Sequence, residues 1–245
     1  EEGVQEVSNG SFSQEGSEEI TNGDFENGST GWALNGWTIS NGKANCNGIT
    51  ANLIQSNVGG ANKNFKLVFT ISDYISGVVR PAFVGLNAES PDFSGNGTYT
   101  AYISSLTDLR FVFYGNLFNG SIDNVSVREV GQDWTFSGGS EITEQGARIN
   151  NTITGANAFI KQINSNLTIG KSLVFQYDVV ETNGKNLAIE QIGGNIALNT
   201  STIGNNRKVY FEFDRADASL IIKRAAAATD VTITNISVKE VGQNW

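Results

Sequence analysis

The chain has 245 residues, a formal net charge of −9 and 28 glycines, but only one cysteine and no histidine. These absences exclude Ser-His and Cys-His catalysis, histidine-bound zinc and an intramolecular disulfide. The negative charge argues against nucleic acid as a partner, because phosphate binding depends on Lys and Arg, and no apolar run is long enough to span a membrane.

The elements predicted along the chain are short β-strands. Apolar and polar residues alternate over 65–72, 109–114 and 209–213, which is typical of half-buried antiparallel strands. Asn-Gly pairs recur between the strands, and both residues tolerate the positive φ that tight hairpin turns need. No segment has the apolar spacing and caps of a helix. We therefore predict an all-β chain.

An internal repeat divides the chain. Residues 122–134 return almost unchanged as 233–245, at an offset of 111 residues, and residues 67–69 match 173–175. A period near 110 residues is too long for a solenoid and fits whole domains. We predict two tandem antiparallel β-sandwich (jelly-roll) domains, at residues 20–131 and 132–245.

The two ends of the chain also resemble parts of the repeat. Trp245 corresponds to Trp134, which opens the second domain, so a further repeat is expected to start there. Residues 4–7 resemble 127–130, the end of the first domain. Residues 1–19 are therefore expected to be an N-terminal segment or the remnant of a preceding repeat, with chance similarity over four residues as the alternative.

The first domain carries a family resemblance in its opening and closing segments. Residues 21–28 (Thr-Asn-Gly-Asp-Phe-Glu-Asn-Gly), Gly31-Trp32, residues 36–39 and Ile122-Asp-Asn-Val-Ser-Val127 resemble the carbohydrate-binding jelly-roll modules of cellulases and xylanases. These modules belong to the galactose-binding-like β-sandwich superfamily. The junctions of the form Val-Lys-Glu-Val-Gly-Gln-Asn-Trp also resemble domains found in structural proteins of environmental bacteriophages.

The first resemblance implies a structural Ca²⁺ ion. Its ligand positions fall on Glu26 and Asp123 of this sequence, with Asp24 nearby, and oxygen ligands suit a hard cation. The alternative is that these are solvated carboxylates or turn caps. In the second domain Thr234 replaces Asp123 and the Asn-Gly-Asp-Phe-Glu strand is missing, so we expect no metal there.

A sugar-binding surface needs aromatic faces that stack on sugar rings and polar groups that bind hydroxyls. Strand parity places a candidate set on the outer side of the first domain, with Arg80 within reach: Tyr74, Tyr102, Arg110 and Tyr114. The alternatives are cross-strand pairing or a protein interface. The corresponding set in the second domain has one aromatic residue, Tyr210, which favours a spacing or packing role.

No pair of carboxylates is arranged for glycoside hydrolysis, so we predict a non-catalytic protein. The favoured hypothesis is a bacteriophage virion surface component, as capsid decoration or tail fibre, with glycan recognition by the first domain. Its partners would be other virion proteins, copies of itself, or cell-surface or free polysaccharide. The alternatives are an extracellular carbohydrate-binding module of a secreted polysaccharide-degrading enzyme and a bacterial adhesin stalk.

Overall fold

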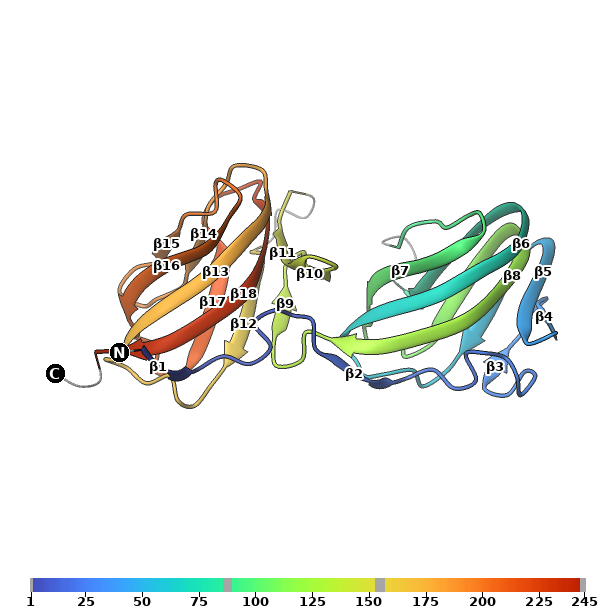
Figure 1. Ribbon diagram of the computed structural model, residues 1–245, viewed down its shortest axis with the longest axis horizontal. Coiled ribbons are helices and arrows are strands. Elements are labelled where there is room, and N and C mark those ends of the chain that lie inside the picture. Colours follow the sequence, from blue (N-terminus) through green and yellow to red (C-terminus); the bar gives the residue numbers. More distant parts are fainter. Residues whose placement is uncertain (1, 86–89, 153–156, 243–245) are drawn as a thin grey trace. The chain divides into compact units, whose positions relative to one another are not determined.

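The structure, a computed structural model, describes residues 2–85, 90–152 and 157–242. Every regular element in these ranges is a β-strand, and all strand pairs are antiparallel. The described residues include no helix that could cross a membrane. Two compact units share the chain (Figure 1): residues 15–130 form the first domain, and residues 1–14 with 131–245 form the second. The prediction of an all-β chain with two antiparallel β-sandwich domains is confirmed.

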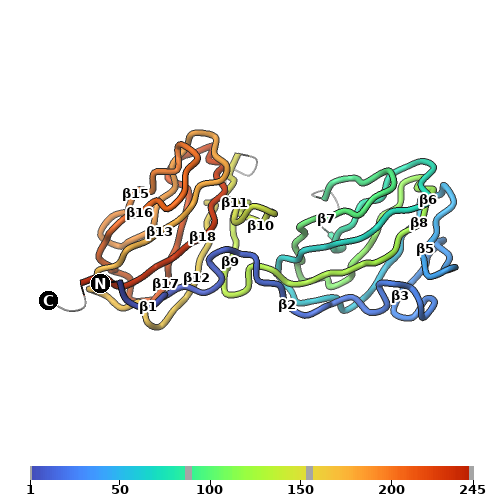
Figure 2. Tube along the Cα trace, in the orientation of Figure 1, coloured from blue at the N-terminus to red at the C-terminus, as the bar shows by residue number. Residues whose placement is uncertain are grey.

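The first domain is built from one curled sheet of seven strands (Figure 2). The strand order is β3-β5-β8-β6-β7, with β2 paired to β8 and β4 paired to β5. The strands are β2 (Glu15–Glu18), β3 (Trp32–Ala33), β4 (Thr38–Ser40), β5 (Lys43–Gln55), β6 (Asn64–Phe83), β7 (Gly97–Ser104) and β8 (Phe111–Val130).

The alternating pattern of β6 accounts for the core of this domain. Phe65, Leu67, Phe69 and Ile71 are at most 1% exposed, as the alternation over 65–72 predicts. They pack in one apolar cluster with aromatic side chains from β8 and from the opening segment before β3. Burial of large apolar side chains is the main stabilising contribution to a sandwich of this kind.

The second domain has two separate sheets around a single apolar cluster. One sheet has the order β10-β11-β18-β13-β16 with β1 added to β18, and the other has the order β15-β14-β17-β12-β9. The strands are β1 (Glu2–Gln5), β9 (Thr135–Ser137), β10 (Ser140–Thr143), β11 (Gly146–Asn150), β12 (Phe159–Ile163), β13 (Ser172–Thr182), β14 (Leu187–Ile189), β15 (Ile196–Leu198), β16 (Gly204–Glu212), β17 (Ser219–Arg224) and β18 (Asp230–Val241).

The opening strand of the second domain comes from the N-terminal segment. Strand β1 pairs with β18, with Gln5 opposite Lys239, in the same way that β2 pairs with β8, with Glu18 opposite Arg128. Residues 2–12 are therefore an opening segment, made of β1 and a turn, and not the end of a preceding repeat, which corrects the interpretation drawn from residues 4–7. Asn9-Gly10-Ser11-Phe12 corresponds to Asn22-Gly23-Asp24-Phe25 of the first domain, and both segments are turns, where the sequence predicts a strand.

A buried glutamine holds each opening segment by its backbone. In the second domain the amide of Gln162 accepts from Ser8 N at 2.8 Å and donates to Ser8 O at 3.0 Å. In the first domain Gln55 makes the same two bonds with Thr21, at 2.8 and 2.9 Å. Both glutamines are less than 5% exposed, so these bonds are protected from water. The equal contacts show that residues 2–12 and 15–25 hold equivalent places.

An aromatic pair closes each opening segment. The rings of Phe12 and Trp134 are 5.3 Å apart in the second domain, and those of Phe25 and Trp32 are 5.3 Å apart in the first. Both phenylalanines are buried and both have positive φ, 59° and 53°. A phenylalanine rarely adopts that backbone conformation, so the packing of the ring must offset its cost.

The domain boundaries consequently differ from those predicted at 19/20 and 131/132. The N-terminal segment 1–19 is divided, with residues 1–14 in the second domain and residue 15 onward in the first. The first domain is thus inserted between Gln14 and Gly131 of the second. Trp245, at which a further repeat is expected, lies outside the described residues.

Candidate functional site

One row of polar and aromatic side chains crosses the sheet of the first domain. Tyr114 on β8 lies opposite Asn52 on β5 and opposite Arg80 on β6. The preceding residue Phe113 is fully buried, so alternation directs Tyr114 to the outer face of the sheet. The ring of Tyr114 is half-buried there, and this burial raises the pKa of its hydroxyl.

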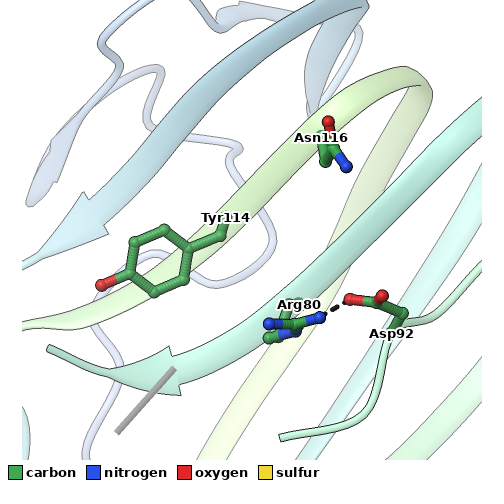
Figure 3. A pocket seen from close by; sticks show the side chains of 4 residues that line it. All are labelled: Arg80, Asp92, Tyr114 and Asn116. Carbon is green, nitrogen blue, oxygen red and sulfur yellow. Dashed lines mark hydrogen bonds and ion pairs between the residues drawn. The ribbon is translucent and has the colours of Figure 1, made fainter. Parts of the chain in front are cut away.

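A small hollow lies beside this row. It has a volume of about 150 Å³ and is lined by Arg80, Asp92, Tyr114 and Asn116 (Figure 3). Arg80 Nε donates to Asp92 Oδ1 at 2.8 Å, which holds the guanidinium next to the tyrosine. The hollow is smaller than the roughly 300–1,000 Å³ typical of small-molecule sites. It therefore suits one portion of a ligand that extends along the face.

Arg110 lies four residues before Tyr114, at the start of β8. Its guanidinium binds the carboxylate of Asp108, with Nε 2.9 Å from Oδ1. This contact lowers the pKa of Asp108 and raises that of Arg110. The charge of Arg110 also acts on the Tyr114 hydroxyl. These two residues of the predicted sugar-binding set thus belong to one region of the sheet.

The other two predicted residues lie elsewhere. The Tyr74 hydroxyl donates to Gly77 O at 3.0 Å, and its ring packs against the apolar cluster near Phe118. Tyr102 on β7 lies opposite Lys66, fourteen residues before Arg80 on β6. Of the four predicted residues, Tyr114 alone lines the hollow, together with Arg80, Asp92 and Asn116, whereas Arg110 lines a separate hollow with Asp108.

Asp92 and Asn116 are the residues of this site that strand parity did not select. Asn116 lies two residues after Tyr114 on β8, so the same alternation that selects the tyrosine also points to this amide. Asp92 lies in a loop, and only the folded chain brings it to Arg80. No local sequence signal identifies it.

Two of the three carboxylates of the expected calcium site, Asp24 and Asp123, accept hydrogen bonds from neighbouring residues. Asp24 accepts from Glu26 N at 3.3 Å, and Asp123 accepts from Asn124 N at 2.6 Å. Within the part of the chain that the structure describes, no three Asp, Glu or Cys side chains are grouped as metal ligands. Calcium binding at Asp24, Glu26 and Asp123 stays a prediction from the resemblance.

The second domain has hydroxyl groups at the corresponding positions. Alignment of the opening segments places Ser11 and Ser13 where the first domain has Asp24 and Glu26. The hydroxyl of Thr234, which replaces Asp123, donates to Ser11 O at 3.2 Å. The reason to expect no calcium in this domain therefore changes: the opening segment is present, but Ser11, Ser13 and Thr234 replace its carboxylates.

Several charged residues of the second domain form ion pairs. Arg148 binds Asp230 at 2.7 Å, and this contact is the main cause of the raised pKa of Arg148. Arg215 binds Asp217 at 2.9 Å, which lowers the pKa of that carboxyl. Tyr210, the aromatic residue of the outward set, is 63% exposed. These ion pairs lie near the surface and account for the pKa shifts of Arg148 and Asp217, so the shifts do not indicate a functional site in this domain.

Of the comparisons with known proteins, only the one with solved structures finds similar chains. No family model matches the chain, and no curated protein matches it. The tandem CBM22-1–CBM22-2 domain of Paenibacillus barcinonensis Xyn10C is 8% identical, with 94% of this chain and 99% of that chain covered and a TM-score of 0.36. A triple jelly-roll structure from an archaeal virus turret is 13% identical, with 93% and 60% covered and a TM-score of 0.24. A truncated AlyQ with CBM32 and alginate lyase domains is 8% identical, with 81% and 91% covered and a TM-score of 0.24. Scores this low carry no inference about function.

Proposed function

We propose that the chain is a non-catalytic binding and structural protein whose first domain recognises a glycan. The observation that carries this proposal is the hollow beside Tyr114. The tyrosine ring offers an apolar face to the C–H side of a sugar, while Arg80, Asp92 and Asn116 offer donors and acceptors to its hydroxyls. The Arg80–Asp92 contact fixes both polar groups before a ligand arrives, which reduces the ordering cost of binding.

Among the described residues of this face, the carboxylates are not arranged for glycoside hydrolysis. A glycosidase uses two carboxyl groups across the scissile bond, of which one has a raised pKa and acts as the acid. Here Asp92 and Asp108 are each held in an ion pair, with Arg80 and Arg110. The pKa of Asp108 is lowered by its arginine, the opposite of what a general acid needs. These pairings support recognition without cleavage.

A glycan array followed by calorimetric titration tests the proposal. We expect Tyr114→Ala to weaken binding by about tenfold or more, which corresponds to a loss of about 1.4 kcal/mol. Tyr102→Ala is the matched control, because Tyr102 lies on another part of the sheet, and it should bind as the parent chain does. If Tyr114→Ala retains full affinity, this face is not the binding site. If the array shows no glycan at all, the proposal as a whole fails.

We propose a virion surface as the setting, with capsid decoration or a tail fibre as the specific role. Its support is the repeated closing segment, 122–134 and 233–245, whose style resembles bacteriophage structural proteins. Antibody labelling of purified particles tests this setting. A hydrolase domain in the same reading frame would instead favour a module of a polysaccharide-degrading enzyme, and a cell-wall anchoring signal would favour an adhesin stalk.

A further inference from the structure

We propose that residues 2–12 of one copy of this chain can dock in the second domain of another copy. This opening segment contributes β1 and the turn that ends at Phe12. Its acceptor consists of β18, Gln162 and Trp134. The proposed partner is therefore a second copy of the chain, and the interface is the one that the structure shows within a single chain.

The acceptor recognises the segment largely through its backbone. Gln162 binds both the N–H and the carbonyl group of Ser8, at 2.8 and 3.0 Å. Glu6 N donates to Val238 O at 2.7 Å, and Ile236 N donates to Gly10 O at 2.9 Å. Backbone pairing of this kind is the way in which an added strand binds to a sheet edge.

Buried side chains anchor the segment in the core. Val7 and Phe12 are 6% and 3% exposed and belong to the apolar cluster of the second domain. Glu6 is 3% exposed, and its carboxylate lies 3.6 Å from Lys171 Nζ, which also binds Glu240 at 3.0 Å. An emptied acceptor would leave this lysine and the apolar pocket exposed, so the domain needs an occupant.

The chain connectivity allows residues 2–12 to be exchanged between two copies. Residues 2–12 are joined to the rest of their domain only through residues 15–130, which form the whole first domain. In the first domain, by contrast, the equivalent segment 15–25 continues directly to Trp32 of the same domain. An exchanged segment makes the same contacts as before, so chain entropy and protein concentration decide between one copy and two.

Cysteine pairs placed on separate chains test the exchange. Glu2 and Val241 are opposite each other in the β1–β18 pair, where antiparallel Cα atoms are about 4.5–5.5 Å apart and a disulfide fits. Chains with Glu2→Cys are mixed with chains with Val241→Cys, both with Cys46→Ala, then unfolded, refolded together and oxidised. The matched control uses Glu15→Cys and Val130→Cys, the corresponding pair in the first domain.

We expect a disulfide-linked dimer from the first mixture, in a yield that rises with protein concentration and exceeds the control several-fold. A chain with both Glu2→Cys and Val241→Cys should form the bond internally, which verifies the geometry. Equal dimer yields from the two mixtures would overturn the proposal.

A synthetic peptide of residues 2–14 provides a second readout. In excess it should suppress the dimer, because it fills the acceptor in place of another copy. The same peptide with Gly10→Val should not, since a Cβ at that position would lie 1.9 Å from Ile236 O. Suppression by both peptides, or by neither, would contradict docking at this acceptor.

Discussion

Replacing Phe12 by alanine tests whether residues 2–12 belong to the second domain. Phe12 is 3% exposed, and its ring is 5.3 Å from Trp134 and 6.2 Å from Phe136. Truncation of a buried phenylalanine costs about 3–5 kcal/mol. Alanine keeps the Cβ atom, so the strain of a φ of 59° stays in place and the loss reports packing.

The expected loss is a large share of a domain's stability, and it should be confined to one domain. At the scale of these domains it corresponds to a fall in Tm of roughly 10–20 °C. Phe25→Ala is the matched variant, because Phe25 is 1% exposed and packs on Trp32 at the same centroid distance. It should destabilise the first domain instead.

Hydrogen exchange read by mass spectrometry separates the two domains. In Phe12→Ala we expect faster exchange in β13 and β18, whose backbone bonds depend on a stable second domain, and unchanged exchange in β6 and β8. Phe25→Ala should give the reverse. The assignment of residues 2–12 to the second domain is refuted if Phe12→Ala leaves β13 and β18 protected or loosens the first domain.

Two further predictions concern the same fold. Gln162→Ala should cost the second domain about 2–4 kcal/mol in urea unfolding, because two buried hydrogen bonds are lost and the Ser8 backbone groups are left unpaired. Gln55→Ala should do the same to the first domain, and a loss below 1 kcal/mol in both would contradict the argument. Lys223, and to a smaller extent Arg215, lowers the pKa of the Glu190 carboxyl in the folded chain. The ionised carboxylate therefore stabilises the second domain above pH 4.5, the ordinary pKa of the group, and this contribution is lost as the pH falls through the lowered pKa. We expect the Tm of the second domain to fall below pH 4.5 and Glu190→Gln to make that fall smaller.

The strands could be predicted because their signal is local. Alternation over 65–72 identifies the buried face of β6, since each strand residue turns its side chain to the face opposite its neighbour's. The all-β class followed from many such runs separated by Asn-Gly turns. Neither inference requires knowledge of which strands pair.

The candidate binding face could be predicted only in part, because the alternation of side chains is interrupted at a β-bulge. The register of β6 against β8 shifts between Ser72 and Ser76, and Tyr74 lies in that interval. Four residue steps on β6 face two on β8 in this interval, so the regular alternation is interrupted there and counting from Phe69 does not place Tyr74. Tyr114 has no bulge between it and the buried Phe113, and counting places it correctly.

The order of the repeated segments distinguishes an inserted domain from a tandem one. In a tandem pair, opening and closing segments recur at the same offset and in the same order. Here the closing segments are 111 residues apart, from 122 to 233, and that of the first, inserted domain comes first. The opening segments are only 13 residues apart, from 2 to 15, and that of the second domain comes first. The two opening segments share the pattern Glu-Gly followed by Asn-Gly and Phe, so comparison of the chain with itself at a short offset would have found them.

A domain can be inserted into another when its first and last residues lie close together, because the host domain then needs only a small gap between the two points at which its chain is interrupted. Glu15 and Val130 meet this condition, since they lie opposite each other in the β2–β8 pair. On the host side, the Asn9 side-chain amide donates to Gln132 O at 3.4 Å, so the two edges of the gap in the second domain are held together by its own contacts. The β2–β8 pairing thus keeps the two ends of the inserted domain close together, and the Asn9–Gln132 contact does the same for the two interrupted ends of the host domain.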